Sequence, residues 1–233
     1  MSIVESLSRE LELHLTKGIL IRFLKKQGYT YRRIRKCLRG SPDPDVLAKK
    51  TLELAQLLKL EEKKFLKVYF ADEAGFNETP SVPYGWQAPQ DSLSARSGRG
   101  QRLNVFGMMT RNNELHTATT SMSVTSTFVL AQVDKLADDP ARDTDVVVVF
   151  DNAKIHHAAA FQAKIPEWSE KGVRIFYLPT YSPHLNAIET LWRKMKYEWL
   201  LPAHYESWAD VKEQINHIIK NFGSKFSIQF SSA

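Results

Sequence analysis

One segment constrains the fold more than any other: the unbroken apolar run VVVVF at positions 146–150, which ends at Asp151. Five consecutive apolar residues, four of them valine, predict a strand that is covered on both faces, as in the centre of a parallel or mixed sheet. A helical pattern follows at about 158–171, and after Gly172 comes a second apolar run at about 173–178. This order is typical of a βαβ crossover, so we expect two parallel, neighbouring strands.

The remaining elements complete a mixed sheet. Apolar residues alternate from about 65 to Asp72, which predicts a strand that buries one face, and Asp72 continues that face. Two further strands, at about 103–110 and 114–121, are joined by a hairpin at Asn112 and Asn113. Helices are predicted at about 125–137, from after Pro183 to about 200, and at about 208–221. The order predicts an α/β protein with a ribonuclease H-like mixed sheet flanked by helices.

The N-terminal region has a different character. Two short helices are predicted at about 4–11 and 17–26, with Thr16 capping the second and Gly28 ending it. This is the outline of a partial helix-turn-helix DNA-binding segment over residues 1–40, although helical hairpins are common. The prolines of SPDPD, from position 41, begin a linker helix over 41–64. Residues 65–233 then form the ribonuclease H-like domain.

The positive charge of the chain is concentrated before that domain. Residues 1–64 hold 15 Lys or Arg against 8 Asp or Glu, whereas the remainder holds 17 against 18. This pattern favours a nucleic acid partner, although a solvated basic face is the alternative. A second basic group, spaced by small residues, suits an arm along a DNA backbone. The candidate DNA-binding residues are Arg32, Arg33, Arg35, Lys36, Arg96, Arg99 and Arg102.

Cysteine content and hydropathy exclude several classes of protein. The single cysteine, Cys37, rules out an intramolecular disulfide and a cysteine-based zinc site, and it fits a reducing, intracellular setting. No apolar stretch approaches the ~20 residues of a membrane span. We therefore expect a cytoplasmic protein with no membrane partner.

Three carboxylates carry the candidate chemistry: Asp72, Asp151 and Glu189. The two aspartates end apolar strands, where ligands gather in open α/β sheets. Glu189 lies in a helix whose apolar stripe includes Leu185 and Trp192, so we expect it to face the core, where an unpaired charge would cost several kcal/mol. A cation would remove that cost. The alternatives are helix caps for the aspartates and, for Glu189, an ion pair with neighbouring Arg193.

Carboxylates without nitrogen or sulfur ligands favour Mg²⁺, with Mn²⁺ as a substitute. Two such ions, about 3.5 to 4 Å apart, would activate an attacking oxygen and stabilise a leaving oxygen in phosphoryl displacement. Asn152 either orients a carboxylate or a water through its amide or is an ordinary turn residue. His156 and His157 are candidates for contact with a scissile phosphate or a metal-bound water.

Three motifs resemble the catalytic segments of bacterial insertion-sequence transposases of the mariner-like superfamily: FADEAGF (70–76), FDNAKIHH (150–157) and LPTYSPHLNAIETLWRKMK (178–196). The resemblance runs from about Gly28 to the C-terminus. It implies a DDE transposase in which Asp72, Asp151 and Glu189 bind the metals. It also implies hydrolytic nicking at transposon ends, followed by attack of the freed 3′-hydroxyl on target DNA, usually at TA.

The resemblance further implies double-stranded DNA as partner, as transposon ends and as target, a homodimer that pairs two ends, and a place at the nucleoid of a bacterial cytoplasm. The sequence departs from the family pattern at His184 and Ala187, where Glu and Pro are common, and neither change removes a metal ligand. The N-terminal DNA-binding region is shorter than the family's usual two helix-turn-helix units. The chain is therefore expected to be a downstream reading frame, a truncated remnant or a deliberately trimmed protein.

Two other functions remain open from the sequence. A ribonuclease H-like nuclease or junction resolvase would use similar carboxylates to cut without joining, although the YSPHLNAIE motif and the basic N-terminus argue against it. A remnant that binds DNA without transposing is the other alternative, although all three acids are present.

Overall fold

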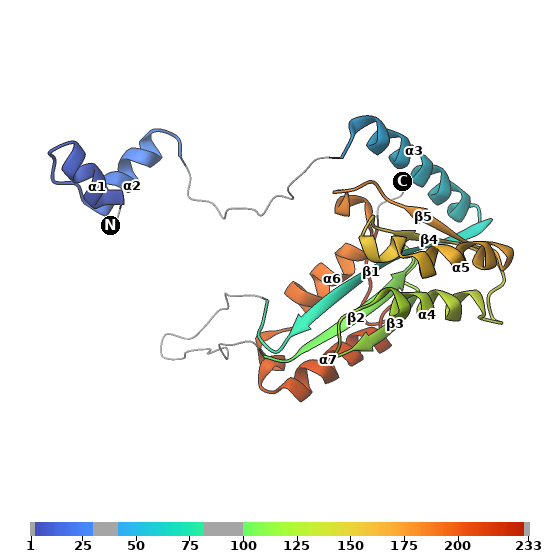
Figure 1. Cartoon of the computed structure of the whole chain (residues 1–233). Coiled ribbons are helices and arrows are strands. Elements are labelled where there is room, and N and C mark those ends of the chain that lie inside the picture. Colours follow the sequence, from blue (N-terminus) through green and yellow to red (C-terminus); the bar gives the residue numbers. More distant parts are fainter. Residues whose placement is uncertain (1–2, 30–41, 82–99, 231–233) are drawn as a thin grey trace. The chain divides into compact units, whose positions relative to one another are not determined.

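The computed structural model describes residues 3–29, 42–81 and 100–230, and it divides into two compact units, Met1–Arg39 and Gly40–Ala233 (Figure 1). The first unit contains α1 (Ile3–Glu10) and α2 (Lys17–Lys26), which confirms the two predicted helices. The Thr16 hydroxyl accepts a hydrogen bond from the Ile19 amide at 3.3 Å, and Gly28 has a φ of 80° just after the helix. Thr16 thus caps the start of α2, and a left-handed glycine follows its end.

The second unit is built on one five-stranded mixed sheet. Its strands are β1 (Leu66–Asn77), β2 (Arg102–Met109), β3 (Leu115–Thr120), β4 (Asp145–Phe150) and β5 (Val173–Tyr177). The order is β3-β2-β1-β4-β5. β2 runs antiparallel to β1 and β3, while β4 runs parallel to β1 and β5. The predicted hairpin and the predicted parallel crossover are therefore both confirmed.

Helices cover both faces of this sheet (Figure 1). Buried side chains of α4 (Ser126–Ala137) and α5 (Ala159–Glu170) pack on one face. Those of α3 (Pro44–Glu62), α6 (Ile188–Lys194) and α7 (Trp208–Lys220) pack on the other. The unit also contains the short 3₁₀-helical turns η1 (Lys154–His157), η2 (Pro183–Leu185) and η4 (Pro202–Tyr205). Within the described ranges, no helix combines the length and apolar character that crossing a membrane requires.

The helix that carries Glu189 is shorter than predicted. The pattern predicts one helix to about residue 200, but α6 ends at Lys194 and the chain continues as a π-helical turn, η3 (Met195–Trp199). The amide of Leu200 donates to the carbonyl of Met195 at 3.0 Å, the five-residue spacing of a π-helix. Trp192, Met195 and Trp199 keep the spacing of three and four residues that is typical of an α-helix, so the sequence did not reveal the change.

The central strand β1 also differs from its prediction, because both of its faces are buried and it continues five residues beyond Asp72 to Asn77. Tyr69, expected on an open face, is 3% exposed under the α4–α5 layer. Its hydroxyl donates to Glu114 Oε2 at 2.9 Å, which satisfies the one polar atom of the side chain. The strand continues because its pairing with β2 extends to Asn77 opposite Arg102, after the pairing with β4 has ended.

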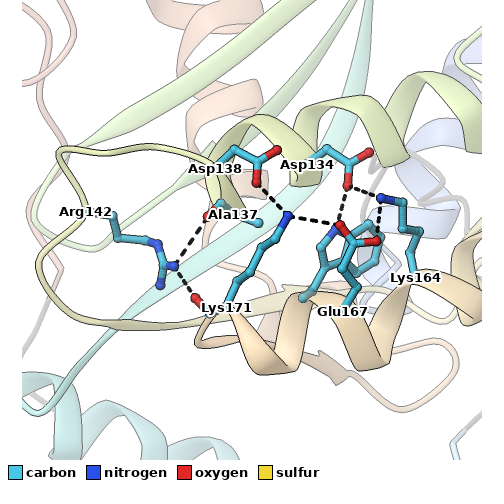
Figure 2. A network of polar contacts seen from close by, with 8 residues as sticks. Asp134, Ala137, Asp138, Arg142, Lys164, Glu167 and Lys171 are labelled. Atoms are coloured by element: carbon cyan, nitrogen blue, oxygen red, sulfur yellow. Dashed lines mark hydrogen bonds and ion pairs between the residues drawn. The ribbon is translucent and has the colours of Figure 1, made fainter.

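A polar network ties α4 to α5 on the outside of that layer (Figure 2). Lys171 Nζ lies 2.7 Å from Asp138 Oδ1 and 2.9 Å from Glu167 Oε1. The buried indole of Trp168 donates to Asp134 Oδ1 at 2.8 Å. Arg142 donates to backbone carbonyls near the ends of both helices, those of Ala137 and Lys171. Exposed ion pairs contribute little individually, so the part-buried hydrogen bonds of Trp168 and Arg142 matter most for this junction.

The last described segment is fastened to the β2–β3 hairpin through Asn113. This residue has a φ of 66°, and its side chain bonds twice to the backbone of Ile228, donating to the carbonyl at 3.0 Å and accepting from the amide at 2.7 Å. Ile228 is 3% exposed in the core beneath α6 and α7. The hairpin turn thus holds the segment that closes this side of the core.

Candidate active site

Strand register brings the two candidate aspartates to the same level of the sheet. Phe70 of β1 lies opposite Val149 of β4, and β4 ends one residue later at Phe150. Asp72 follows Phe70 by two positions and Asp151 follows Val149 by two positions. The two aspartates therefore lie at the same level on neighbouring strands, which are ~4.8 Å apart. Because side chains alternate along a strand, Asp72 shares the face of Phe70, which α6 covers.

The segment before α6 is tied directly to the neighbour of Asp72. The buried amide of Asn186 donates from Nδ2 to the carbonyl oxygen of Ala71 at 3.1 Å. This bond fixes the start of α6, and with it Glu189 in the first turn, against β1. The three carboxylates thus come from β1, from the end of β4 and from α6, and the structure brings them to one end of the sheet.

The expectation that Glu189 faces the core is wrong. Its neighbours Ile188, Leu191 and Trp192 are buried, but Glu189 itself is exposed. The stripe that packs on the sheet passes through positions 188, 191, 192 and 195, which leaves position 189 at its margin. The cost of a buried charge therefore falls more heavily on Asp72 than on Glu189, whose carboxylate is only partly buried.

The carboxylates differ in their electrostatic surroundings. Burial, and then the charge of Glu189, raise the pKa of Asp72 to about 8. Partial burial also raises the pKa of Glu189, against the opposing effect of Lys196. Burial acts in the same direction on Asp151, but contacts with His156 and the Ala153 amide outweigh it and hold that pKa below its ordinary value. Asp72 is thus the acid whose negative charge is least compensated.

These residues fit a divalent cation by their chemistry. Asp72 interacts electrostatically with both Glu189 and Asp151, and those two interact with each other. Three mutually repelling carboxylates, one of them largely buried, supply the oxygen ligands that Mg²⁺ and Mn²⁺ prefer. In the described part of the chain, no three His, Cys, Asp or Glu side chains stand close enough together to hold a metal ion as they are.

His156 contacts the second aspartate from within the core. It is 1% exposed, and its Nε2 lies 3.3 Å from Asp151 Oδ1. Its ring packs against Phe150 and Phe161, with centroids 4.5 and 6.0 Å away. His157 instead bonds through Nε2 to the amide oxygen of Asn152. Asn152 is therefore directed to a neighbouring histidine, while His156 is the residue that touches a candidate ligand.

Three residues at this site were not predicted as functional. Trp192 donates from its indole to Asp72 Oδ2 at 3.1 Å. Lys196 lies half-buried in the field of Asp72 and Glu189, with its Nζ 5.5 Å from the centroid of the Phe76 ring. Asn186 holds the Ala71 carbonyl. Sequence spacing could have indicated two of them, because Trp192 and Lys196 follow Glu189 by three and seven residues and so lie near it on one side of the helix.

Of the candidate DNA-binding residues, only Arg102 lies in the described part of the chain. It is exposed at the start of β2, and its Nε donates to Asn104 Oδ1 at 2.8 Å. Its charge acts on Lys196, which in turn interacts with Asp72 and Glu189. Arg32, Arg33, Arg35, Lys36, Arg96 and Arg99 lie outside the described residues.

A mixed sheet in this strand order, covered by helices on both faces and bearing carboxylates at one end, defines the ribonuclease H-like class of proteins, as predicted. A solved Mos1 transposase paired-end complex with the left transposon end superposes with a TM-score of 0.59 at 16% identity, covering 94% of this chain and 67% of that one. A mariner Mos1 paired-end complex with Mg superposes with a TM-score of 0.58 at 14% identity, over 94% and 67% of the two chains. At these identities the likeness establishes the fold.

The family follows from the sequence itself. The profile of the DDE superfamily endonucleases matches residues 67–213, a span that includes all three carboxylates, and the chain belongs to that family. A curated relative, an insertion element IS630 uncharacterized 39 kDa protein of Shigella sonnei, is 23% identical over 184 residues. That match covers 78% of this chain and 52% of the relative, so the chain spans about half of the relative's length.

Proposed function

We propose that this chain carries the catalytic domain of a DDE transposase, which nicks DNA at transposon ends and joins the freed 3′-hydroxyl to target DNA at TA dinucleotides. Residues 65–233 form the catalytic domain in this proposal, 41–64 a linker helix and 1–40 a partial DNA-binding segment. Membership of the DDE superfamily endonucleases supports the chemistry, and the likeness to Mos1 transposon-end complexes supports the DNA substrate.

The observation that carries the proposal is the state of Asp72. This carboxylate lies at the sheet end with Glu189 and Asp151 acting on it, and its pKa is raised to about 8. The indole of Trp192 donates to Asp72 and Lys196 lies nearby, yet the pKa stays raised, whereas the partners of a structural ion pair would lower it. Perturbed acids gathered at one edge of a sheet are more typical of a working site than of a structural ion pair.

Asp72, Asp151 and Glu189 would hold two Mg²⁺ ions, or Mn²⁺ as a substitute. When bound, such ions activate the attacking oxygen and stabilise the leaving oxygen in phosphoryl displacement. His156, buried beside Asp151, would keep that carboxylate oriented toward the site. Asn152, bonded to His157, would hold the loop after β4.

The positive residues would bind double-stranded DNA along its backbone. Lys196 interacts with the carboxylates and Arg102 interacts with Lys196, so both would contact phosphates near the reacting bond. The basic residues at 32–36 and at 96–99 would extend that contact along the transposon end and the target. A homodimer would pair two ends, as the name of the Mos1 paired-end complex describes for that protein. The reaction would take place at the nucleoid of a bacterial cytoplasm.

Strand transfer tests this proposal directly. The chain is incubated with a labelled oligonucleotide that ends in a transposon-end 3′-hydroxyl and with supercoiled plasmid, with Mg²⁺, with Mn²⁺ or with EDTA. The matched variants are Asp72→Asn, Asp151→Asn and Glu189→Gln, which remove a charge and keep the side-chain shape. Glu198→Gln is the control, because Glu198 is an exposed acid that pairs with Lys194 on the same helical segment.

Label joined to the plasmid by the wild type and by the control alone, only with metal, supports the proposal. Cleavage without joining would move the function to a ribonuclease H-like nuclease. Salt-sensitive DNA binding without any reaction would indicate a transposase remnant that binds DNA without transposing. Joining by all three carboxylate variants would refute the site.

A further inference from the structure

The indole N–H of Trp192 is hydrogen-bonded to one carboxylate oxygen of Asp72, a proposed metal ligand. Trp192 lies in α6 and is 3% exposed, and its Nε1 donates to Oδ2 of Asp72 at 3.1 Å. An indole N–H can only donate, and a buried tryptophan has few rotational states. The bond therefore restrains the rotation of the carboxylate and leaves its remaining acceptor sites for other partners.

A glycine on the neighbouring strand makes this contact possible. Asp72 of β1 lies opposite Gly107 of β2. A Cβ at position 107 would be 2.9 Å from Cη2 and 3.1 Å from Cζ2 of the Trp192 ring, closer than ordinary van der Waals contact. The indole lies over the glycine, and this allows its nitrogen to reach across to Asp72. The arrangement thus depends on three residues from three elements.

The same helix carries a proposed metal ligand. Glu189 precedes Trp192 by three residues, so both side chains move with α6 as one body. Asn186, just before the helix, holds the carbonyl of Ala71 next to Asp72. The position of α6 therefore sets both where Glu189 stands and how the carboxylate of Asp72 is turned.

We propose that Trp192 is a positioning residue for metal binding: its indole N–H, seated over Gly107, holds the carboxylate of Asp72 in the orientation in which it would bind the cation. The inference rests on the proposed function, because it assumes that Asp72 and Glu189 bind a divalent ion. Groups that orient metal ligands through hydrogen bonds typically contribute about 10- to 100-fold in metal affinity.

The test measures Mn²⁺ binding to the whole chain without DNA. Electron paramagnetic resonance reports binding as a loss of the signal of the free ion. Trp192→Phe keeps an aromatic ring and removes the N–H, and we expect its dissociation constant for Mn²⁺ to rise about 10-fold or more. Gly107→Ala retains the N–H but displaces the ring, and we expect a smaller rise in the same direction.

Trp168→Phe is the matched control. Trp168 is fully buried and also donates to an aspartate, Asp134, but on the α4–α5 face of the sheet. The same replacement there removes a Trp–Asp bond and a similar ring volume. Its Mn²⁺ affinity should equal that of the wild type, and thermal melting of each variant checks that the protein is folded.

Asp72→Asn separates failure of this inference from failure of the proposed function. If the wild type binds Mn²⁺ no better than Asp72→Asn, the metal site itself is refuted. If Asp72→Asn weakens binding while Trp192→Phe and Gly107→Ala bind as tightly as the wild type, Trp192 is only a core residue and the inference is overturned. Weakening by both of these variants but not by Trp168→Phe supports it.

Discussion

The Nε2 atom of His156 lies 3.3 Å from Oδ1 of Asp151, and the two side chains differ sharply in exposure, at 1% and 51%. A buried ring thus reaches outward to an acid at the edge of the sheet. The other ring nitrogen, Nδ1, is buried without a hydrogen-bond partner among the described residues. Core packing alone would favour phenylalanine here, because an unpaired buried nitrogen destabilises the fold.

We therefore expect His156→Phe to lower metal-dependent DNA nicking by about 10- to 100-fold, while its melting temperature stays close to that of the wild type. The phenyl ring keeps the packing on Phe150 and Phe161 and removes the contact with Asp151. His116→Phe is the control, because this exposed ring of β3 packs edge-on against Tyr69 and contacts none of the proposed ligands. Equal nicking by the two variants would contradict a role for His156.

The pKa of Asp72 predicts how stability depends on pH without metal. Its folded value of about 8 lies above the ordinary 3.8, so the folded state holds a proton more tightly than the unfolded state. The resulting stabilisation is greatest below about pH 4 and is lost as the pH rises toward 8. Asp72→Asn removes this dependence. In EDTA, the variant should gain on the order of 1 to 3 kcal/mol relative to the wild type between pH 5 and pH 8.

Chemical denaturation at pH 5, 6.5 and 8 measures this difference in the free energy of unfolding. Glu213→Gln is the control, since Glu213 is an exposed acid of α7 and removing its charge leaves the buried carboxylate of Asp72 unchanged. A constant difference between Asp72→Asn and the wild type across the series would show that the Asp72 pKa is not raised.

Metal should reverse that pH effect. A divalent ion binds the ionised carboxylates of the folded state and stabilises it by mass action. At pH 8 we expect saturating Mg²⁺ to raise the melting temperature of the wild type by several degrees, with a smaller rise at pH 5. Differential scanning fluorimetry of the wild type and of Glu189→Gln tests whether Glu189 is a ligand of the ion. A rise of the same size in that variant would place the ion elsewhere.

The bond between the hairpin and the C-terminal segment predicts a structural effect away from the site. Asn113→Ala removes two hydrogen bonds to Ile228. It also puts alanine at a positive φ, which alanine tolerates less well than asparagine. We expect a loss of about 2 kcal/mol, with faster amide exchange over residues 222–230. Asn112→Ala, at the exposed neighbour, should change stability by less than about 0.5 kcal/mol. Equal losses would argue against the Asn113 contacts.

The sequence predicted those parts of the fold that have one dominant pattern. The run at 146–150 has a single interpretation, and so do the hairpin asparagines and the cap at Thr16, because each is local. The second buried face of β1 was not predicted, since Tyr69 is polar at its tip and only α4 and Glu114 make its burial favourable. The π-helical turn after Lys194 leaves no mark in the periodicity.

In the candidate site, the sequence indicated the three acids but not Trp192 or Gly107. The acids are recognisable because carboxylates at strand ends are costly and motifs accompany them. Trp192 matched the apolar stripe completely, and nothing in the stripe distinguishes an indole that packs from one that also donates to Asp72. The part played by Gly107 depends on the β1–β2 register, which is a tertiary property.

The parallel pairing of β1 with β4 has a consequence for how the protein folds. Phe70 and Val149 are about 80 residues apart, so this pairing closes a long loop and should form after the local β1–β2–β3 meander. Asp72 and Asp151 come together only in that late step, and α6 adds Glu189 later still in the chain. A nascent or partly folded chain thus has no assembled acid cluster, and heat should abolish the proposed nuclease activity in the same transition that melts the β1–β4 pair.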